Sequence, residues 1–318
     1  MMHLPFLPRP IALHIPDGFL SLPVAITFWL ISIVFINMAI RKTRGQFGER
    51  QIPLMGIMAA FIFAAQMINF PVAGGTSGHL LGGALAAIVL GPWAGMLVMV
   101  TVVSVQALIF QDGGLVVMGA NIFNMGLLTT LVGYGLYRGA ANRSRKFQLG
   151  TAGFAAWMSV MAGALLTAFQ LWLSGTSPLR IVFPAMLSVH FLIGLGEAFI
   201  TVAALTFIFQ TRPDILSDVQ SQGGRGWILT GALITLAVLL ISPFASGNPD
   251  GLERVAMNLN FIQRGAEAPF QILPDYTIPA LGETGLSTII AGGAGILVVA
   301  GLTMGIIWLI RKPRHIES

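Results

Sequence analysis

Long apolar runs separated by short polar breaks extend over most of the chain. Runs of this length predict membrane-spanning helices, because roughly 20 apolar residues cross the hydrocarbon core and a helix satisfies its own backbone hydrogen bonds there. We therefore predict an all-α polytopic membrane protein with about nine transmembrane helices. The predicted spans lie near residues 22–40, 53–70, 79–91, 94–110, 121–138, 151–173, 183–209, 227–243 and 286–310. The third is short and contains glycines, which is typical of a helix that begins inside the bilayer.

Lys and Arg residues lie mostly on one side of these spans. Thirteen are on one side and four on the other. Because cytoplasmic loops are enriched in these residues, we predict an outer N-terminus and a cytoplasmic C-terminus, which fits an odd number of spans. The four basic residues on the outer side are Arg9, Arg180, Arg254 and Arg264.

The predicted spans group into two domains. Residues 13–225 hold seven spans joined by short loops, whereas residues 226–318 form a two-span hairpin around an outer loop at 242–285. Residues 1–12 precede both as an N-terminal extension, which lacks the early positive charge and the apolar core of a signal peptide.

Composition narrows the class of protein. Hydrophobic residues make up 55% of the chain and charged residues only 9%, whereas a soluble domain has about 25% charged residues. This excludes a soluble globular enzyme, a nucleic-acid binder and a disordered tail, and it makes membrane lipid the expected surroundings. The chain has no cysteine, so disulfides and metal–thiolate sites are excluded. It also lacks a phosphate-binding loop of the GxxxxGK[ST] type, so we expect ATP hydrolysis on separate chains.

Two histidines stand out as candidate ligands. His14 precedes a Pro-Asp-Gly sequence that predicts a turn, and on spacing alone a plain turn is the simpler interpretation. His79 follows a glycine-rich stretch at predicted membrane depth, where non-helical backbone is tolerated only if it is buried in protein or lines a cavity. From the residues alone, His79 is equally consistent with a ligand and with a structural role. Imidazole nitrogens suit nickel, cobalt, copper and zinc, and the absence of thiolates argues against copper(I).

Other polar residues at predicted membrane depth are also candidates for function. Asn121 and Asn124 share a helix face, where they could support an imidazole or form hydrogen bonds between helices. His190 and Glu197 lie two helical turns apart and suit a buried pair, a proton relay or an interface contact. The remaining polar candidates are Asp17, Gln66, Asn69, Gln106, Gln111 and Asp112.

These residues stand in stretches that resemble a known family, the CbiM/NikM substrate-capture (S) components of energy-coupling-factor transporters for cobalt and nickel. The part after residue 225 resembles the small PDGLE-type (CbiN/NikN-like) component often fused to them. The matching stretches are HIPDGFLS at 14–21, PVAGGTSGHLLGG at 71–83, QDGG at 111–114, NIFNMG at 121–126, HFLIGLGEAFIT at 190–201, NPDGLERVA at 248–256 and PDYTIP at 274–279.

The resemblance implies a function and a set of partners. The subunit would capture Co²⁺ or Ni²⁺ on the outer side of the cell membrane, for cobalamin biosynthesis or for nickel enzymes. A transmembrane coupling protein and cytoplasmic ATPases would drive uptake. The transported ion would be the only metal, with no permanently bound cofactor.

The resemblance also implies the ligands. They are an N-terminal amine, the backbone nitrogen and imidazole of the next residue, and a histidine of the loop after the second span. In this sequence they correspond to Leu13, His14 and His79. The residues expected to support this site are Asp17, Gln111, Asp112, Asn121, Asn124, His190 and Glu197.

The N-terminus departs from the family pattern. The family's histidine follows the initiating methionine, but here twelve residues precede Leu13, so His14 has no adjacent free amine. Three explanations are open: translation starts at position 13, a peptidase removes the extension, or the amine is replaced by another ligand.

Two other classes of function provide alternatives. A self-sufficient secondary transporter or channel would need an intramembrane charge pair and, in many such folds, an inverted repeat. The sequence shows no repeat, and Glu197 is the only clear intramembrane acid. An intramembrane enzyme using His190 and Glu197 would lack an identifiable nucleophile.

Overall fold

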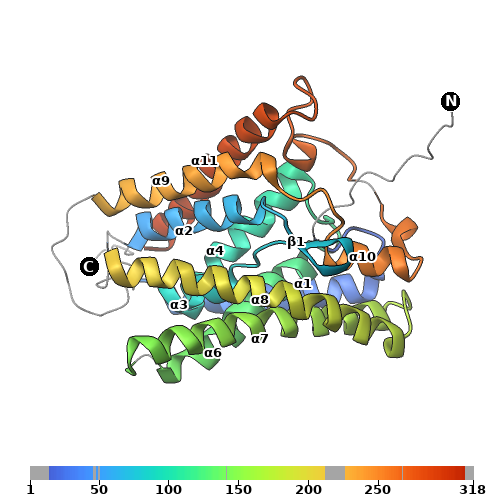
Figure 1. Cartoon of the computed structure of the whole chain (residues 1–318), viewed down its shortest axis with the longest axis horizontal. Coiled ribbons are helices and arrows are strands. Elements are labelled where there is room, and N and C mark those ends of the chain that lie inside the picture. Colours follow the sequence, from blue (N-terminus) through green and yellow to red (C-terminus); the bar gives the residue numbers. More distant parts are fainter. Residues whose placement is uncertain are drawn as a thin grey trace, which may run out of the picture.

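The computed structural model describes residues 14–45, 48, 51–140, 142–211, 226–266 and 268–311. Its long helices run roughly along the longest axis of the molecule (Figure 1). Within the described ranges, six helices are long and apolar enough to cross a bilayer, which confirms a helical membrane protein. They are α1 (Leu22–Thr43), α4 with its π-helical continuation η2 (Pro92–Val105, Gln106–Phe110), α7 (Arg145–Leu173), α8 (Leu179–Thr211), α9 with the 3-10 turn η6 (Gly226–Ile241, Ser242–Phe244) and α11 (Gly285–Arg311).

The predicted count of nine spans is not reproduced, because several apolar stretches form shorter helices. The predicted span at 53–70 is a helix of only 16 residues, α2, followed by extended chain. The predicted span at 121–138 is divided by a π-helical segment, which widens the turn. The shorter helices are α2 (Gln51–Gln66), α5 (Met118–Asn121), η3 (Ile122–Leu128), α6 (Thr129–Tyr137) and η4 (Arg138–Ala140).

The predicted third span, 79–91, is wrong as a membrane crossing. Only Gly83–Leu90 is helical (α3), and eight residues rise about 12 Å, less than half of a hydrocarbon core of about 30 Å. Gly82 and Gly91 bound the helix with φ values of 81° and 83°, in the left-handed region that glycine adopts without strain. The apolar composition reflects burial inside the protein, because seven of the eight residues are buried.

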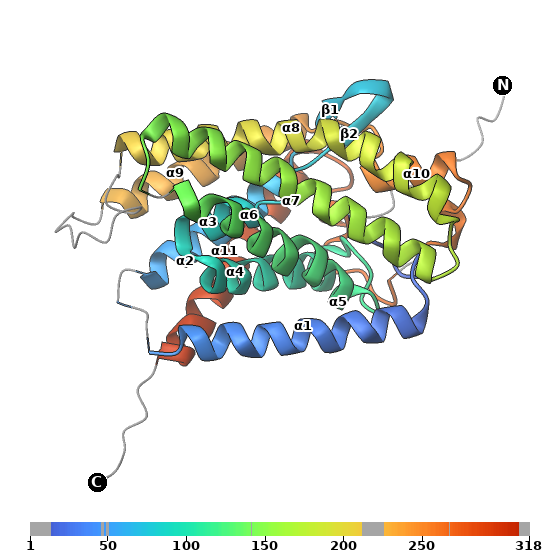
Figure 2. The ribbon, with the colours of Figure 1, turned by 90° about the horizontal axis from the view of Figure 1, so that it is seen from below.

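A small β-hairpin precedes this helix. Strands β1 (Phe70–Val72) and β2 (Thr76–Gly78) pair antiparallel, with Phe70 opposite Gly78. The turn between them (η1, Ala73–Gly75) has positive φ at Gly74 and Gly75, which glycine allows. The hairpin places His79 directly after β2, at the end of the bundle where α1 begins (Figures 1 and 2).

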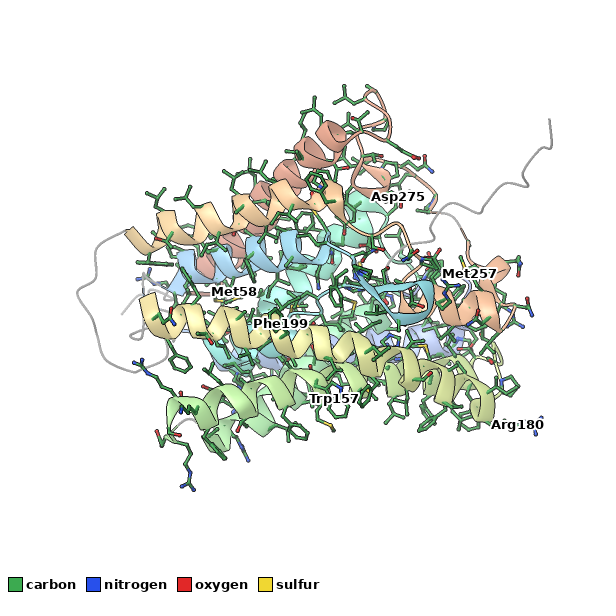
Figure 3. The ribbon with its side chains drawn as sticks, viewed as in Figure 1. Met58, Trp157, Arg180, Phe199, Met257 and Asp275 are labelled. Carbon is green, nitrogen blue, oxygen red and sulfur yellow. The ribbon has the colours of Figure 1, made fainter. Side chains whose placement is uncertain are left out.

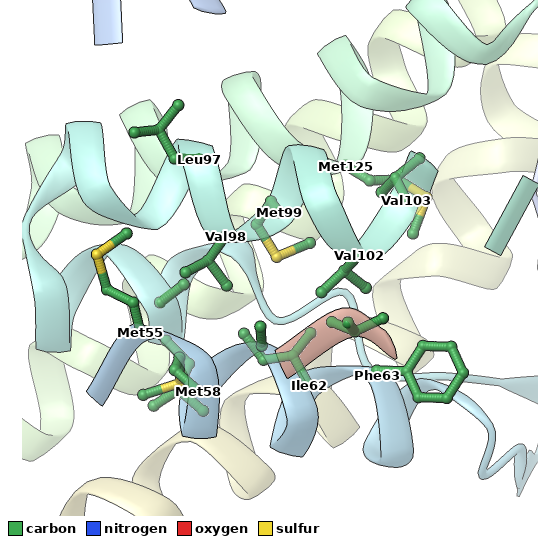
Figure 4. Close-up of a cluster of buried hydrophobic side chains, with 14 of the residues drawn as sticks. Met55, Met58, Ile62, Phe63, Leu97, Val98, Met99, Val102, Val103 and Met125 are labelled. Carbon is green, nitrogen blue, oxygen red and sulfur yellow. The ribbon is translucent and has the colours of Figure 1, made fainter. Parts of the chain in front are cut away.

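Close packing through small residues holds the helices together. A β-carbon on Gly194 of α8 would lie 2.8 Å from the ring of Trp157 of α7, so only glycine permits this approach. Large apolar side chains of α2 and α4 interdigitate beside it in the main core, as Figure 4 shows for Ile62, Phe63 and Val102. The core therefore lies between α2, α4 and their neighbours.

The C-terminal hairpin, by which we mean α9, α11 and the residues between them, packs against α2 (Figure 1). On the α11 side, a β-carbon on Gly295 would lie 2.3 Å from the ring of Phe63, so this contact also requires glycine. The residues between the helices, 245–284, form the hairpin loop and contain three short helices. They are α10 (Gly251–Asn258), η7 (Ile262–Arg264) and η8 (Pro274–Tyr276).

The two ends of the bundle differ in character. Helix α1 ends, α7 begins and α11 ends at the same end, which carries Arg41, Lys42, Arg145 and Arg311 (Figure 2). The hairpin loop covers the other end, where Figure 3 labels Met257 and Asp275. This arrangement agrees with the charge pattern of the sequence, but the orientation in the membrane stays a prediction.

Candidate metal-binding cavity

His14, His79 and His190 line one cavity of about 70 Å³ near the β-hairpin and the hairpin loop. The rings of His14 and His79 have centroids 5.6 Å apart and meet edge to face at 72°. A single water needs about 10–15 Å³ measured in the same way, so the cavity has room for an ion with several waters. It therefore brings three imidazoles together from the first segment, the loop after β2 and α8.

All three imidazoles direct the same ring nitrogen at a carbonyl oxygen. Nδ1 lies 3.0 Å from the Asp112 carbonyl in His14, 3.0 Å from the Leu80 carbonyl in His79, and 2.8 Å from the Met186 carbonyl in His190. A carbonyl only accepts hydrogen bonds, so Nδ1 carries the proton in each neutral ring. The lone pair is then on Nε2, the nitrogen that is able to bind a metal.

The His14 segment is fastened to the chain around residues 112–121. The Asn121 side chain accepts a hydrogen bond from the Ile15 amide at 3.1 Å and donates one to the Ile15 carbonyl at 2.9 Å. The Asp17 carboxylate accepts from the amides of Leu115 at 2.9 Å and Val117 at 3.1 Å. Asn121 lines the cavity, whereas Asp17 acts only on the backbone.

The predicted chelate meets an obstacle at His14. A ring that includes both the backbone nitrogen and the imidazole of one histidine closes through Nδ1, and Nδ1 is bonded to Asp112. The Nε2 atom of His14 is instead buried, with no hydrogen-bond partner in the described part of the chain. Leu13, the predicted source of the amine, lies outside the described residues.

Asp112 is the polar neighbour of His14. Its Oδ1 lies 3.5 Å from His14 Nδ1, and its Oδ2 accepts a 2.6 Å hydrogen bond from the Tyr276 hydroxyl. Gln106 donates to the same hydroxyl at 3.1 Å. Burial, together with the nearby Asp112, raises the pKa of Tyr276 well above its usual range, so this phenol keeps its proton at neutral pH.

The loop after β2 is fastened by α8. The Glu197 carboxylate is fully buried and accepts hydrogen bonds from the amides of Leu81 at 2.6 Å and Gly82 at 2.9 Å. Gln66 donates to the Leu81 carbonyl at 2.8 Å. The predicted pairing of Glu197 with His190 is therefore replaced by contacts between Glu197 and the loop that carries His79.

The other predicted residues divide by position. Asn124 lines the cavity and also bonds to Gln170 and Thr167 of α7, which is the helix-to-helix interpretation of this residue. Gln111 lies outside the cavity and accepts a hydrogen bond from the Ile272 amide of the hairpin loop at 3.2 Å. The Asn69 carbonyl accepts from the Ser246 amide of the same loop at 2.8 Å.

Two hairpin-loop residues near the cavity were not predicted. Asp250 lines the cavity and caps α10, accepting from the Glu253 amide at 2.7 Å in a capping box. Burial raises the pKa of Asp250 well above its usual range. The Asp-Gly-Leu-Glu spacing could have indicated this cap, but its position at the cavity depends on long-range folding. Tyr276, the second residue, carried no local signal.

The described residues contain no group of three or more His, Asp or Glu side chains placed to hold a metal ion together. A cation in the cavity would therefore need main-chain nitrogen or water in addition to the imidazoles. Nitrogen donors of this kind suit nickel(II), cobalt(II) and copper(II) better than magnesium or calcium.

Comparison with known proteins decides the family. The sequence profile of the family described as the cobalt uptake substrate-specific transmembrane region, CbiM, matches residues 14–215. The chain belongs to the CbiM family. The profile of the PDGLE domain matches residues 225–312, so the C-terminal hairpin of this CbiM-family chain is similar to that domain.

Curated relatives extend the similarity over both parts. An Archaeoglobus fulgidus protein that carries the provisional name fused nickel transport protein NikMN is 37% identical over 91% of this chain and 96% of its own length. The fused nickel transport protein NikMN of Rhodobacter capsulatus is 33% identical over 71% and 72%. The cobalt transport protein CbiM of Sorangium cellulosum is 33% identical over 65% and 96%.

A solved structure shares the fold of the CbiM part. The crystal structure of a truncated transition metal transporter is 32% identical, with a TM-score of 0.56 over 62% of this chain and 98% of that one. This CbiM-family chain is thus a membrane protein of cobalt and nickel transport, and its family supplies a component of energy-coupling-factor transporters.

Proposed function

We propose that this CbiM-family chain is the substrate-capture subunit of an ATP-driven energy-coupling-factor transporter that takes up Co²⁺ or Ni²⁺. The observation that carries the proposal is the cavity in which His14 and His79 each present Nε2. Nickel is the first ion to test, because relatives that match both parts of the chain are named for nickel transport.

In this proposal, His14 and His79 bind the ion, and the amine of residue 13 joins them only if it is the first residue. The capture domain comprises residues 13–225 and the PDGLE-type domain residues 226–318. The cavity faces the outside, since the opposite end carries the basic residues expected in the cytoplasm. A transmembrane coupling protein and cytoplasmic ATPases supply the energy, as the missing phosphate loop suggests.

Imidazole ligands suit this role physically. Neutral nitrogen donors add no net charge, so a divalent ion can leave the site when the partners reshape it. Backbone carbonyls orient each ring and raise its basicity, as hydrogen-bond partners of metal-binding histidines commonly do. Asn121 and Glu197 would keep the two histidine-bearing segments in register with each other.

Metal content measured by mass spectrometry tests the proposal. The purified chain would be equilibrated with equal Co²⁺, Ni²⁺ and Zn²⁺ and then washed. We expect about one Ni²⁺ or Co²⁺ per chain, and we expect His79→Ala and His14→Ala each to lose it while staying folded. His315→Ala is the matched control, since it lies beyond both family-matched segments.

Two results would contradict the proposal. Unchanged metal content in His79→Ala would remove this histidine from the site, and no bound metal in the unaltered chain would remove capture itself. Uptake of the metal by the chain alone in vesicles, without coupling partners, would instead favour a secondary transporter.

A further inference from the structure

The hairpin loop reaches His14 through two side chains. We propose that Tyr276 and Asp112 are positioning residues for His14: Tyr276 fixes Asp112, and Asp112 holds the imidazole so that Nε2 binds the metal. This inference rests on the proposed function, and it assigns to the C-terminal hairpin a direct part in the affinity of the site.

The hydrogen bonds define a direction for the proton on each group. Gln106 donates to the Tyr276 oxygen at 3.1 Å, so the phenol uses its own hydrogen for Asp112 Oδ2 at 2.6 Å. The second carboxyl oxygen, Oδ1, is buried and has no hydrogen-bond partner in the described part of the chain. It lies 3.5 Å from His14 Nδ1, beside the Asp112 carbonyl at 3.0 Å. Two oxygens therefore face Nδ1, which favours its protonated form.

The packing around Tyr276 is specific. Its ring stacks on Phe110 with centroids 4.7 Å apart and planes 18° apart, and Phe63 lies at 5.9 Å. The backbone at Asp275 and Tyr276 has φ of 51° and 56°, a region that costs non-glycine residues about 1–3 kcal/mol each. Insertion of the ring into the core must offset this cost. The chain is thus bent so that the hydroxyl reaches Asp112.

The chain on either side of this contact is also anchored. The Leu273 amide donates to the Ile109 carbonyl at 2.9 Å, three residues before Asp112. On the far side, the Ile278 amide donates to the Ser287 hydroxyl of α11 at 2.6 Å. Loss of the Tyr276 hydroxyl alone should therefore leave the ring in place, because the ring contacts and both anchors persist.

The test compares Tyr276→Phe with the unaltered chain and with Tyr134→Phe, which removes a hydroxyl from α6. Nickel affinity would be measured on the full chain by isothermal titration, alongside thermal unfolding without metal. Partners that hydrogen-bond directly to a metal ligand change affinity by about 10–100-fold. Tyr276 acts one step further away, so we expect a loss of roughly 3- to 10-fold, with Tyr134→Phe unchanged.

Two further measurements separate positioning from general destabilisation. In a His14→Ala background, Tyr276→Phe should have no further effect on residual nickel binding, since its effect passes through His14. In protein with ¹⁵N-labelled histidine, the His14 signals should show Nδ1 protonated, and Tyr276→Phe should shift them toward mixed tautomers. The His14 signals would be assigned by their absence from His14→Ala.

The outcomes are distinguishable. If the unaltered chain binds no nickel or cobalt, the proposed function fails and the positioning role falls with it. If it binds metal and Tyr276→Phe binds equally well, only the positioning role fails. An equal loss in the His14→Ala background would also overturn it, because the effect would then not pass through His14.

Discussion

Two carboxylates fasten the two histidine-bearing segments by nearly the same hydrogen-bond pattern. Asp17 accepts from the amides of Leu115 and Val117, and Glu197 accepts from those of Leu81 and Gly82. The surroundings differ, because Asp17 is partly exposed where the chain enters α1, whereas Glu197 is fully buried within α8.

The difference in burial predicts a difference in energy. An amide that loses its acceptor costs about 1–3 kcal/mol when it stays buried, and much less when water can reach it. Glu197 satisfies two amides in the interior, at a depth where no other acceptor is near the loop. Asp17 does the same at the rim. The same pattern is therefore expected to be essential in one place and moderately stabilising in the other.

The largest effect is expected from Glu197→Ala. It leaves the amides of Leu81 and Gly82 without an acceptor in the interior, so we expect about 3–5 kcal/mol of destabilisation and loss of metal binding. Thermal unfolding in detergent and metal content would be measured together. Glu283→Ala is the control, since Glu283 is exposed on the hairpin loop.

Glu197→Gln sharpens this test. Its side-chain oxygen can accept from one amide, but its NH₂ group faces the other donor, so the variant should lie between the unaltered chain and Glu197→Ala. A Glu197→Ala chain with unchanged stability and metal content would contradict the comparison, because burial of the carboxylate would then carry no consequence.

A medium effect is expected from Asp17→Ala. Water can replace part of the lost hydrogen bonding, so we expect about 1–2 kcal/mol of destabilisation and a reduced, but measurable, metal affinity. Asp17→Asn should cost less, since one acceptor oxygen persists. If Asp17→Ala proved as damaging as Glu197→Ala, burial would not be what separates the two carboxylates.

The two segments also show what the sequence can reveal. Apolar runs predict α1, α7, α8, α9 and α11 well, because lipid-facing and core-facing residues are equally apolar. The same signal fails for 79–91, since a short buried helix and a membrane crossing have the same composition.

The candidate site was predictable in part, for a similar reason. Glycines around His79 indicated an irregular buried loop, and the Pro-Asp-Gly sequence after His14 indicated a turn. Which group satisfies these backbones is a matter of long-range contact, as between Glu197 and Leu81, separated by 116 residues. The contact of Tyr276 with Asp112 crosses 164 residues and could not be read from local pattern.

The smallest effect is expected from Arg254→Ala, which acts on the same β-hairpin from the solvent side. The Arg254 guanidinium of α10 donates to the Gly75 carbonyl in the turn between β1 and β2. This turn is also held by two contacts from Ser77, whose amide donates to the Pro249 carbonyl at 2.9 Å and whose hydroxyl donates to the Asn248 carbonyl at 2.8 Å.

Because those contacts persist and water can solvate the Gly75 carbonyl, Arg254→Ala should change stability by no more than about 0.5 kcal/mol. Thermal unfolding and nickel affinity would be compared with Arg180→Ala, a substitution at an exposed position of α8 (Figure 3). A loss close to that of Glu197→Ala would mean that the His79 loop depends on the hairpin loop more than on α8. The anchoring of this site would then lie between the two family-matched parts of the chain rather than within the first.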